Sequence, residues 1–411
     1  MNAVVSLLGE EAGKCINCGF CESVCPTLPS SDYRAIYGSR GRVLVGKRVF
    51  EEIVTNKKTE LRVSDSFYSC LDCYACFQVC PAGVNAGKVS SIMRQIITSN
   101  QYTAFNQEKN IARMIVTATL KYNSPIGNKV SVLWAKDIHF NYASNTLFYT
   151  GTMYQEMPNS KALASLKEKF SDSMADSFAK FITKIPFLIK FSAAIYDKNL
   201  KEKMEIYLHD IAVLLREAGV ELNYLGSEEP YPGTFLHDLG YIDEFKEYAL
   251  KVTKLFKDRH IKKIITVDPH TYEILKYVYP AYVPDFDFEV YHYLDLIKKL
   301  NFVKDDEIIT YHEPCHFVLR NIQYNLPKEV LSNIATLKMP AKSGKSNMCC
   351  GGPNEMLYTK LAESVSNARF LELKGTGASK IITACPICYI NIAKDESVTD
   401  IASYLKNHLN F

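Results

Sequence analysis

The cysteines of this chain fall into three sets, each of which could hold metal. The chain contains 13 cysteines, and every one belongs to one of these sets. Two runs share the spacing Cys-x2-Cys-x2-Cys-x3-Cys-Pro: the first run is Cys15, Cys18, Cys21 and Cys25, and the second run is Cys70, Cys73, Cys76 and Cys80. The third set is Cys315, the adjacent pair Cys349 and Cys350, and the closely spaced Cys385 and Cys388. So many closely spaced thiolates indicate a protein that binds iron and sulfur.

The two runs have the spacing of loops that wrap three thiolates around one [4Fe-4S] cube and give the fourth to a second cube. The first centre would then be held by Cys15, Cys18, Cys21 and Cys80, and the second centre by Cys70, Cys73, Cys76 and Cys25. Zinc and disulfides are the alternatives, but zinc seldom binds thiolates in this pattern, and four cysteines so close in sequence would form strained disulfides. The spacing therefore predicts two cubane clusters.

Composition restricts the class of protein. The chain has 411 residues and is 47% hydrophobic, enough for a sizeable core and on the order of two or three domains. A net charge of +3 gives no indication of a nucleic-acid partner. We find no apolar stretch long enough to span a membrane, and residues 1–11 lack the basic start and apolar run of a secretory signal. We therefore expect a cytoplasmic protein whose thiols stay reduced.

The pattern of apolar residues divides the chain into a helical part and an α/β part. Residues 1–105 hold both runs, separated by a helical segment that includes 42–53, which favours an all-α ferredoxin type. Residues 106–145 are expected to form a connector. From 146 onward, apolar strands alternate with amphipathic helices, such as 242–256 and 355–374, which predicts α/β units.

The α/β part contains an internal repeat. Residues 263–272 match residues 380–389 as a strand followed by a turn marked by proline in both copies. We therefore divide it into a copy over 146–290, with an insertion at about 158–202, and a copy over 291–411 that carries the third cysteine set. On this alignment none of the five cysteines is present in the earlier copy, where the equivalent residues are Thr152, Tyr231, Pro232, Asp268 and Thr271.

The third set carries a resemblance to a known family. Its five cysteines, with Gly351-Gly352-Pro353 after the adjacent pair, resemble the CCG domain of heterodisulfide reductase. The order of two ferredoxin loops and then paired CCG repeats resembles the D-type subunit of that enzyme and the iron–sulfur subunits of glycolate, lactate and anaerobic glycerol-3-phosphate dehydrogenases. The segments 39–42 (Ser-Arg-Gly-Arg) and 311–315 (Tyr-His-Glu-Pro-Cys) support this resemblance. It implies a pseudo-twofold pair of α/β CCG repeats after the ferredoxin-type domain.

The resemblance also implies a third centre. Cys315, Cys349, Cys350, Cys385 and Cys388 would bind an unusual, non-cubane [4Fe-4S] cluster. Adjacent cysteines suit such a cluster, because they ligate different irons more easily than they complete one tetrahedron. An ordinary cube, or a structural zinc held by four of the five thiolates, is the alternative. In relatives with two such clusters, a disulfide is split so that each cluster takes one sulfur. Residues 146–290 lack the cysteine ligands of a second cluster, so that mechanism would be unavailable to this chain.

The expected function is electron transfer within a dehydrogenase or heterodisulfide-reductase-like complex. No Gly-x-Gly-x-x-Gly follows a strand, so we expect no flavin or nicotinamide on this chain. The resemblance implies a flavoprotein subunit, with or without other subunits, that passes single electrons through the two cubanes to the third centre and on to a quinone or other acceptor. The chain alone would not oxidise the organic substrate.

The alternative is an enzyme, a thiol-disulfide or persulfide reductase acting at the third centre. His312 and His316, which flank Cys315, are then the candidate proton donors. Without catalysis, they would donate hydrogen bonds to cluster sulfur. Arg40 and Arg42 would offset the negative charge of the clusters or dock a partner.

Residues 177–196 form a further candidate site. Apolar residues at helical spacing, with Lys180, Lys184 and Lys190 among them, predict a basic amphipathic helix that Pro186 kinks. One hypothesis places this helix on the inner face of an anionic membrane, as a peripheral contact. In the other, the helix packs on the core of the protein and its lysines are solvated.

Overall fold

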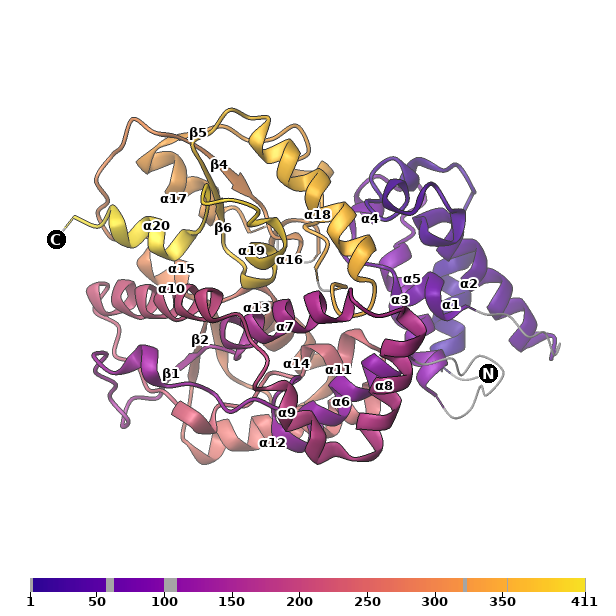
Figure 1. Cartoon of the computed structure of the whole chain (residues 1–411), viewed down its shortest axis with the longest axis horizontal. Coiled ribbons are helices and arrows are strands. Elements are labelled where there is room, and N and C mark those ends of the chain that lie inside the picture. The colour runs from indigo at the N-terminus through magenta and orange to yellow at the C-terminus, as the bar shows by residue number, and fades with distance from the viewer. Residues whose placement is uncertain (1–2, 57–62, 100–108, 321–323, 353, 411) are drawn as a thin grey trace.

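The computed structural model describes residues 3–56, 63–99, 109–320, 324–352 and 354–410. Figure 1 shows α1 to α5 at one end of the molecule and the two β-sheets in the remaining part, with α7 and α10 running between the sheets. The expected boundary at 105/106 lies outside the described residues. No helix among those described is long and apolar enough to cross a membrane.

The N-terminal part is helical, and no strand occurs in its described residues 3–56 and 63–99. Helices α1 (Ala3–Gly13), α2 (Ser39–Val54) and α5 (Ala86–Thr98) pack against one another. Gly46 permits this contact, because a Cβ there would lie 2.8 Å from Cγ1 of Val89. The cysteine loops are shaped by short helices: η1 (Phe20–Glu22), η2 (Pro29–Ser31), η3 (Ala35–Tyr37), α3 (Ser64–Tyr68) and α4 (Ala75–Gln78).

The first sheet is parallel, in the order β1 (Thr146–Tyr149), β2 (Lys263–Thr266), β3 (Glu289–His292). Phe148 is opposite Ile265, which is opposite Tyr291. Successive residues of β1 and β2 are buried because helices cover both faces, as is usual for parallel sheets. The helices that precede or connect these strands are α6 (Asn110–Tyr122), η5 (Leu133–Ala135), α7 (Met153–Lys167), α8 (Asp172–Lys184), η6 (Pro186–Leu188), α9 (Ile189–Ser192), α10 (Lys198–Glu217), η7 (Gly226–Glu228), α11 (Thr234–Asp238), α12 (Ile242–Asp258), α13 (Pro269–Glu273), the π-helix η8 (Ile274–Val278) and α14 (Tyr279–Tyr282).

The second sheet is also parallel, in the order β5 (Thr336–Leu337), β4 (Ile308–His312), β6 (Lys380–Thr383), β7 (Val398–Asp400). Tyr311 is opposite Ile382, which is opposite Thr399. The helices of this part are α15 (Tyr293–Ile297), α16 (Cys315–Val318), α17 (Leu326–Ile334), η9 (Gly344–Ser346), α18 (Thr359–Lys374), α19 (Pro386–Ile392) and α20 (Ile401–Asn407). The sequence predicted this fold class at a coarse level: a helical N-terminal part is followed by parallel α/β sheets.

Two segments differ from their expected form. The connector contains the helix α6, which packs against α8. The helix expected over 355–374 begins only at Thr359, because 354–358 form a turn in which the amides of Leu357 and Tyr358 donate to the carbonyl of Asn354. This turn carries the chain away from the adjacent cysteines at the end of the sheet.

Candidate metal centres

The cysteines assigned to the first centre line one cavity. Cys15 and Cys18 lie on the loop after α1, Cys21 lies in η1, and Cys80 reaches the same cavity from beyond α4. Gly19 has φ +83°, which turns the loop between Cys18 and Cys21. The remaining lining is Ile16, Arg40, Val43, Ala82, Val84 and Ala86. The structure thus brings a cysteine of the second run to three of the first, in a setting of mostly apolar side chains.

The cysteines assigned to the second centre line another cavity. They are Cys25, Cys70, Cys73 and Cys76. Asp72 and Tyr74 have positive φ and form the turns that point the loop inward. Burial raises the pKa of the Cys70 and Cys76 thiols. Buried thiolates therefore need nearby positive charge, and a donor set of four sulfurs around one cavity fits iron or another thiophilic metal. That each cavity holds a cube stays a prediction.

Arg42 supplies positive charge to the second cavity. Its side chain is buried, and Nη1 lies 3.7 Å from Sγ of Cys25. Nε donates to the carbonyl of Ser66, and Nη2 donates to the hydroxyls of Thr27 and Ser69, so the guanidinium is held in place. Burial lowers its pKa, but the neighbouring thiolates raise it above its usual value, so Arg42 stays charged.

We expect Arg42→Gln to lower the reduction potential of the second centre. Removing one buried positive charge near a cluster disfavours the more negative, reduced state by roughly 50 to 100 mV. A redox titration followed by electron paramagnetic resonance measures the shift. Arg40→Gln is the control, because Arg40 is 38% exposed and paired with Glu22, and it lies at the first cavity. An unchanged second-centre potential in Arg42→Gln would contradict this role.

The third set of cysteines converges at the carboxyl end of the second sheet. Cys315 opens α16 after β4, Cys385 and Cys388 follow β6, and Cys349 and Cys350 come from the loop before α18. Cys315 and Cys350 both raise the pKa of the Cys349 thiol, so these side chains are neighbours, and the sulfurs of Cys350 and Cys388 lie within 4.8 Å of each other. All five are buried and free of disulfides. Parallel strands commonly place ligand sites at this edge of a sheet.

The two glycines after the adjacent cysteines are required by close packing. Gly351 has φ +95°, and a Cβ there would lie 2.4 Å from the carbonyl oxygen of Ala362. A Cβ on Gly352 would lie 2.3 Å from Cγ2 of Ile387, on the helix that holds Cys388. Pro353 of the same motif lies outside the described residues. The glycines therefore allow the loop of Cys349 and Cys350 to approach α19.

The two candidate histidines have different surroundings. Nδ1 of His312 accepts a hydrogen bond from Nε of Arg369, 3.1 Å away, so Nε2 carries the ring proton. A ring nitrogen of His312 lies within 4.8 Å of the sulfurs of Cys350 and Cys388. Burial lowers the pKa of His312, which makes it a neutral hydrogen-bond donor beside the third set. The structure thus places His312 beside two sulfurs of the third set, and its catalytic role stays a prediction.

His316 bonds a carboxylate rather than a sulfur. Its Nδ1 bonds the carboxylate of Glu273, and its ring lies against that of His270, with centroids 3.7 Å apart. Arg320 also donates to Glu273, at 2.8 Å. His316 therefore belongs to a buried charged network and is a weaker candidate proton donor than His312.

The third set lies directly against the second cavity. Cys349 lowers the pKa of the Cys73 thiol, so the two side chains are neighbours. The side-chain amide of Asn354 donates to the carbonyl of Cys70, 3.4 Å away. Sequence reasoning missed this contact, because no local spacing links the loops.

Two longer-range hydrogen bonds hold the same loops together. Arg320 Nη1 donates to the carbonyl of Asp72 at 3.2 Å, and the amide of Gln78 donates to the carbonyl of Leu319 at 2.8 Å. Each bond joins a residue of the second run's loop to one just after α16. The two candidate centres therefore occupy one continuous buried region.

The five residues of 146–290 that the sequence alignment pairs with the third cysteine set are closed by packing. All five are buried: Thr152, Tyr231, Pro232, Asp268 and Thr271. Asp268 caps α13 through the amides of His270 and Thr271, and a Cβ on Gly151 would lie 2.2 Å from the hydroxyl of Thr271. Nearby Glu229 bonds the Thr150 hydroxyl, and burial raises the pKa of Glu229 to about 8. These oxygen-bearing side chains do not fit an iron–sulfur cluster.

Two stretches of the chain match known domain families. Residues 11–84 match the 4Fe-4S dicluster domain, and residues 309–393 match the cysteine-rich domain. The chain therefore contains an iron–sulfur dicluster domain and a cysteine-rich domain of the CCG type.

Similar proteins agree with these matches. The D-type subunit of dihydromethanophenazine:CoB–CoM heterodisulfide reductase from Methanosarcina acetivorans is 23% identical over 95% of this chain and 91% of its own length. A probable glycolate oxidase iron–sulfur subunit from Bacillus subtilis is 22% identical over 92% of this chain and 87% of its own length. A probable membrane-anchored ferredoxin from Chromohalobacter salexigens is 23% identical over 93% of this chain, but the match spans only 56% of that relative. The resemblance inferred from the cysteine spacing is confirmed.

Proposed function

We propose that this chain is the iron–sulfur electron-transfer subunit of a flavoprotein dehydrogenase or heterodisulfide-reductase-like complex. It would take single electrons from a flavin subunit through two cubanes to a CCG-type centre and on to a quinone or other acceptor. The observation that carries this proposal is the pair of hydrogen bonds that joins the second run's loop to the third cysteine set, from Asn354 to the carbonyl of Cys70 and from Arg320 to the carbonyl of Asp72. Iron–sulfur clusters, when bound, supply one-electron carriers.

Each step of the proposed electron path can be assigned to a part of the chain. The first cavity opens near the exposed Cys18 and the surface pair of Arg40 and Glu22, which suits it to receive electrons from a partner. The second cavity is buried with Arg42. From there Asn354 and Arg320 hold the second run's loop against the third set. Burial of this contact excludes water between the two centres and favours direct transfer.

The earlier copy supports a relay more than paired-cluster chemistry. Its equivalent positions follow the strands in the same way: Thr152 comes three residues after β1, as Cys315 does after β4. We interpret 146–290 as a degenerate CCG repeat, with its insertion at about 158–202, and 291–411 as the intact repeat, related by a pseudo-twofold axis. With ligands in one repeat only, a substrate disulfide has no second cluster to accept its other sulfur.

The names of two relatives support a flavoprotein partner. The heterodisulfide reductase and glycolate oxidase relatives bear names of subunits of larger oxidoreductases. A flavoprotein subunit would oxidise the organic substrate in the cytoplasm and deliver electrons here. This chain would carry no flavin and would bind no nucleic acid.

Turnover between artificial partners tests the relay. The full chain, with its clusters reconstituted anaerobically, should transfer electrons from reduced methyl viologen to a water-soluble quinone analogue. Cys349→Ser should lower this rate by at least about tenfold, while viologen still reduces the other two centres. Thr152→Ser, at the equivalent position of the earlier copy, is the matched control and should keep the wild-type rate. Wild-type turnover by Cys349→Ser would overturn an electron exit at the third centre.

A reductase remains the second candidate, and His312 favours it. A neutral imidazole with its proton on Nε2, within 4.8 Å of Cys350 and Cys388, is suited to donating a hydrogen bond that stabilises a departing thiolate. Sustained reduction of a small disulfide by the isolated chain, lost in Cys349→Ser and slowed in His312→Gln, would favour the reductase. Transfer to quinone without disulfide turnover would favour the relay.

A further inference from the structure

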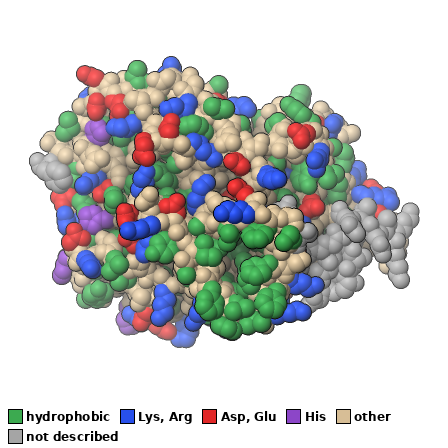
Figure 2. Space-filling model, in the orientation of Figure 1, with side chains coloured by type: hydrophobic (Ala, Val, Ile, Leu, Met, Phe, Trp, Pro, Cys, Tyr) green, Lys and Arg blue, Asp and Glu red, His purple; other side chains and the backbone are tan. Residues whose placement is uncertain are grey.

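Helices α8 and α9, with η6 between them, carry an exposed apolar surface. Its large side chains are 54–64% exposed. We define the aromatic patch as Met174, Phe178, Phe181, Phe187 and Phe191. Figure 2 shows a continuous group of hydrophobic side chains over the region where Figure 1 places these helices. Soluble proteins seldom leave such a group uncovered without a binding role.

The patch is exposed because the other side of the same segment is already packed. On α8, Met174, Phe178 and Phe181 share one face, while Ala179 is buried and Asp176 accepts hydrogen bonds from Asn110 at the start of α6. The break expected at Pro186 is present, since α8 ends at Lys184 and η6 begins at Pro186.

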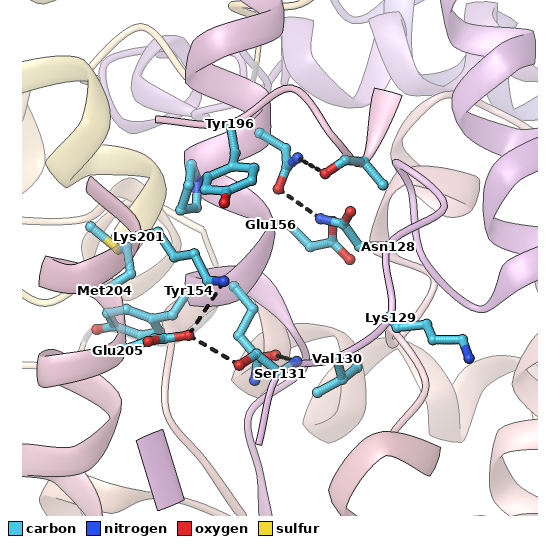
Figure 3. A pocket seen from close by; sticks show the side chains of 14 residues that line it. Asn128, Lys129, Val130, Ser131, Tyr154, Glu156, Tyr196, Lys201, Met204 and Glu205 are labelled. Carbon is cyan, nitrogen blue, oxygen red and sulfur yellow. Dashed lines mark hydrogen bonds and ion pairs between the residues drawn. The ribbon is translucent and has the colours of Figure 1, made fainter. Parts of the chain in front are cut away.

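Hydrogen bonds also hold η6 and α9 to the body of the protein. The carbonyl of Pro186 accepts a hydrogen bond from the Tyr122 hydroxyl at 3.0 Å. The side-chain amide of Asn159 donates to the carbonyls of Ala193 and Ile195. Figure 3 shows the pocket of about 140 Å³ beside this segment, which Tyr196 and Glu156 help to line. The rings of Phe187 and Phe191 therefore project outward from a supported backbone.

Within residues 177–196 the charges have one sign, and on the Met174 side of the patch Asp176 is bonded to Asn110. Lys180, Lys184 and Lys190 are exposed, and residues 177–196 contain no aspartate or glutamate. Lys180 and Lys184 are four residues apart on α8, so they lie along the same side of the helix. Lys190 lies 5.0 Å from the ring centroid of Tyr122, at the edge of the segment. Aromatic side chains bordered by lysines match the headgroup region of an anionic bilayer, where rings enter the interface and ammonium groups meet phosphates.

We propose that the aromatic patch and its lysines are a peripheral docking surface for an anionic lipid bilayer. This inference goes beyond the electron-transfer function and stands without it. The rings would lie at the level of the acyl-chain boundary, and the lysines would remain in the headgroups. Docking would place the α/β part of the chain beside the phase in which lipid-soluble acceptors dissolve.

Vesicle binding tests the proposal on the full chain with its clusters. Wild type should cosediment with vesicles made of equal parts phosphatidylcholine and phosphatidylglycerol, and much less with phosphatidylcholine alone. Phe178→Asp combined with Phe187→Asp should lower binding by at least about tenfold, because two rings leave the interface and two repulsive charges replace them. Replacing Lys180, Lys184 and Lys190 with glutamine should lower binding by at least about tenfold and remove the preference for anionic lipid.

The matched control is Leu371→Asp combined with Val303→Asp, which changes two exposed apolar residues of the C-terminal part. Leu371 is 68% exposed and Val303 is 52% exposed. This variant should bind anionic vesicles as wild type does. Iron content and visible absorption show that each variant is folded. Wild-type vesicle binding by the phenylalanine variant would overturn the proposal. So would the absence of any wild-type binding, including a case in which the patch instead holds a second copy or a protein partner.

Discussion

Cys349→Ser is expected to remove one of three metal centres and to leave the other two intact. Anaerobically purified wild type should contain about twelve irons per chain, and the variant about eight. One electron paramagnetic resonance signal should disappear while two ferredoxin-type signals persist. The reason is that Cys349 is buried beside the rest of the third set, where Cys315 and Cys350 raise the pKa of its thiol.

Two comparisons make this result specific. Cys350→Ser should behave in the same way, because Cys350 lies beside Cys388 and His312. Asp268→Asn, at the position of the earlier copy equivalent to Cys385, should keep about twelve irons, since that copy has no sulfur ligands. About eight irons and one zinc in wild type would contradict the prediction. The cysteine-rich domain would then be structural, and electrons would leave from the ferredoxin-type part.

Cys80→Ser is expected to damage the first centre, although Cys80 belongs to the second run. Cys25→Ser should correspondingly damage the second centre. Each cavity is lined by three cysteines of one run and the last cysteine of the other. Each substitution should cost about four irons or leave a cluster with altered signals.

Reference variants identify which centre is lost. Cys18→Ser marks the first cavity and Cys76→Ser marks the second. The spectrum of Cys80→Ser should match that of Cys18→Ser, and the spectrum of Cys25→Ser should match that of Cys76→Ser. If the spectra pair by run instead, with Cys80→Ser matching Cys76→Ser, each loop binds its own cluster and the crossed assignment is wrong.

Much of the fold followed from local patterns. The strands at 263–266 and 380–383 were predicted because both read Lys-Ile-Ile-Thr before a turn, and buried parallel strands are rich in β-branched residues. The helix expected at 355–374 began late, because 354–358 form a turn closed by hydrogen bonds to the carbonyl of Asn354, which helical spacing does not express.

In the candidate sites, too, some features followed from local sequence and others depended on the fold. Spacing alone grouped the cysteines of the two runs, since ligands of one loop must be close in sequence to converge on one metal. The third set spans 315–388, and its grouping rested on the resemblance to a known family. His312 and His316 were equivalent by sequence, because both flank Cys315. They differ in the fold, where Arg369 orients His312 beside sulfur and Glu273 binds His316. Arg369 and Glu273 are far from these histidines in sequence, so no local sequence pattern could reveal the two hydrogen bonds.

The sequence by itself indicated the chemistry of this protein: an iron–sulfur dicluster domain, a cysteine-rich domain, and a lysine-bordered apolar segment at 177–196. Residue type and short-range spacing carry that information, because ligand loops and amphipathic helices are local structures. Only the tertiary structure decided that Asn354 reaches the carbonyl of Cys70, that Arg42 faces the second cavity, and that the phenylalanines of α8, η6 and α9 remain exposed. These depend on which surfaces of distant elements pack together, and packing is a property of the whole chain.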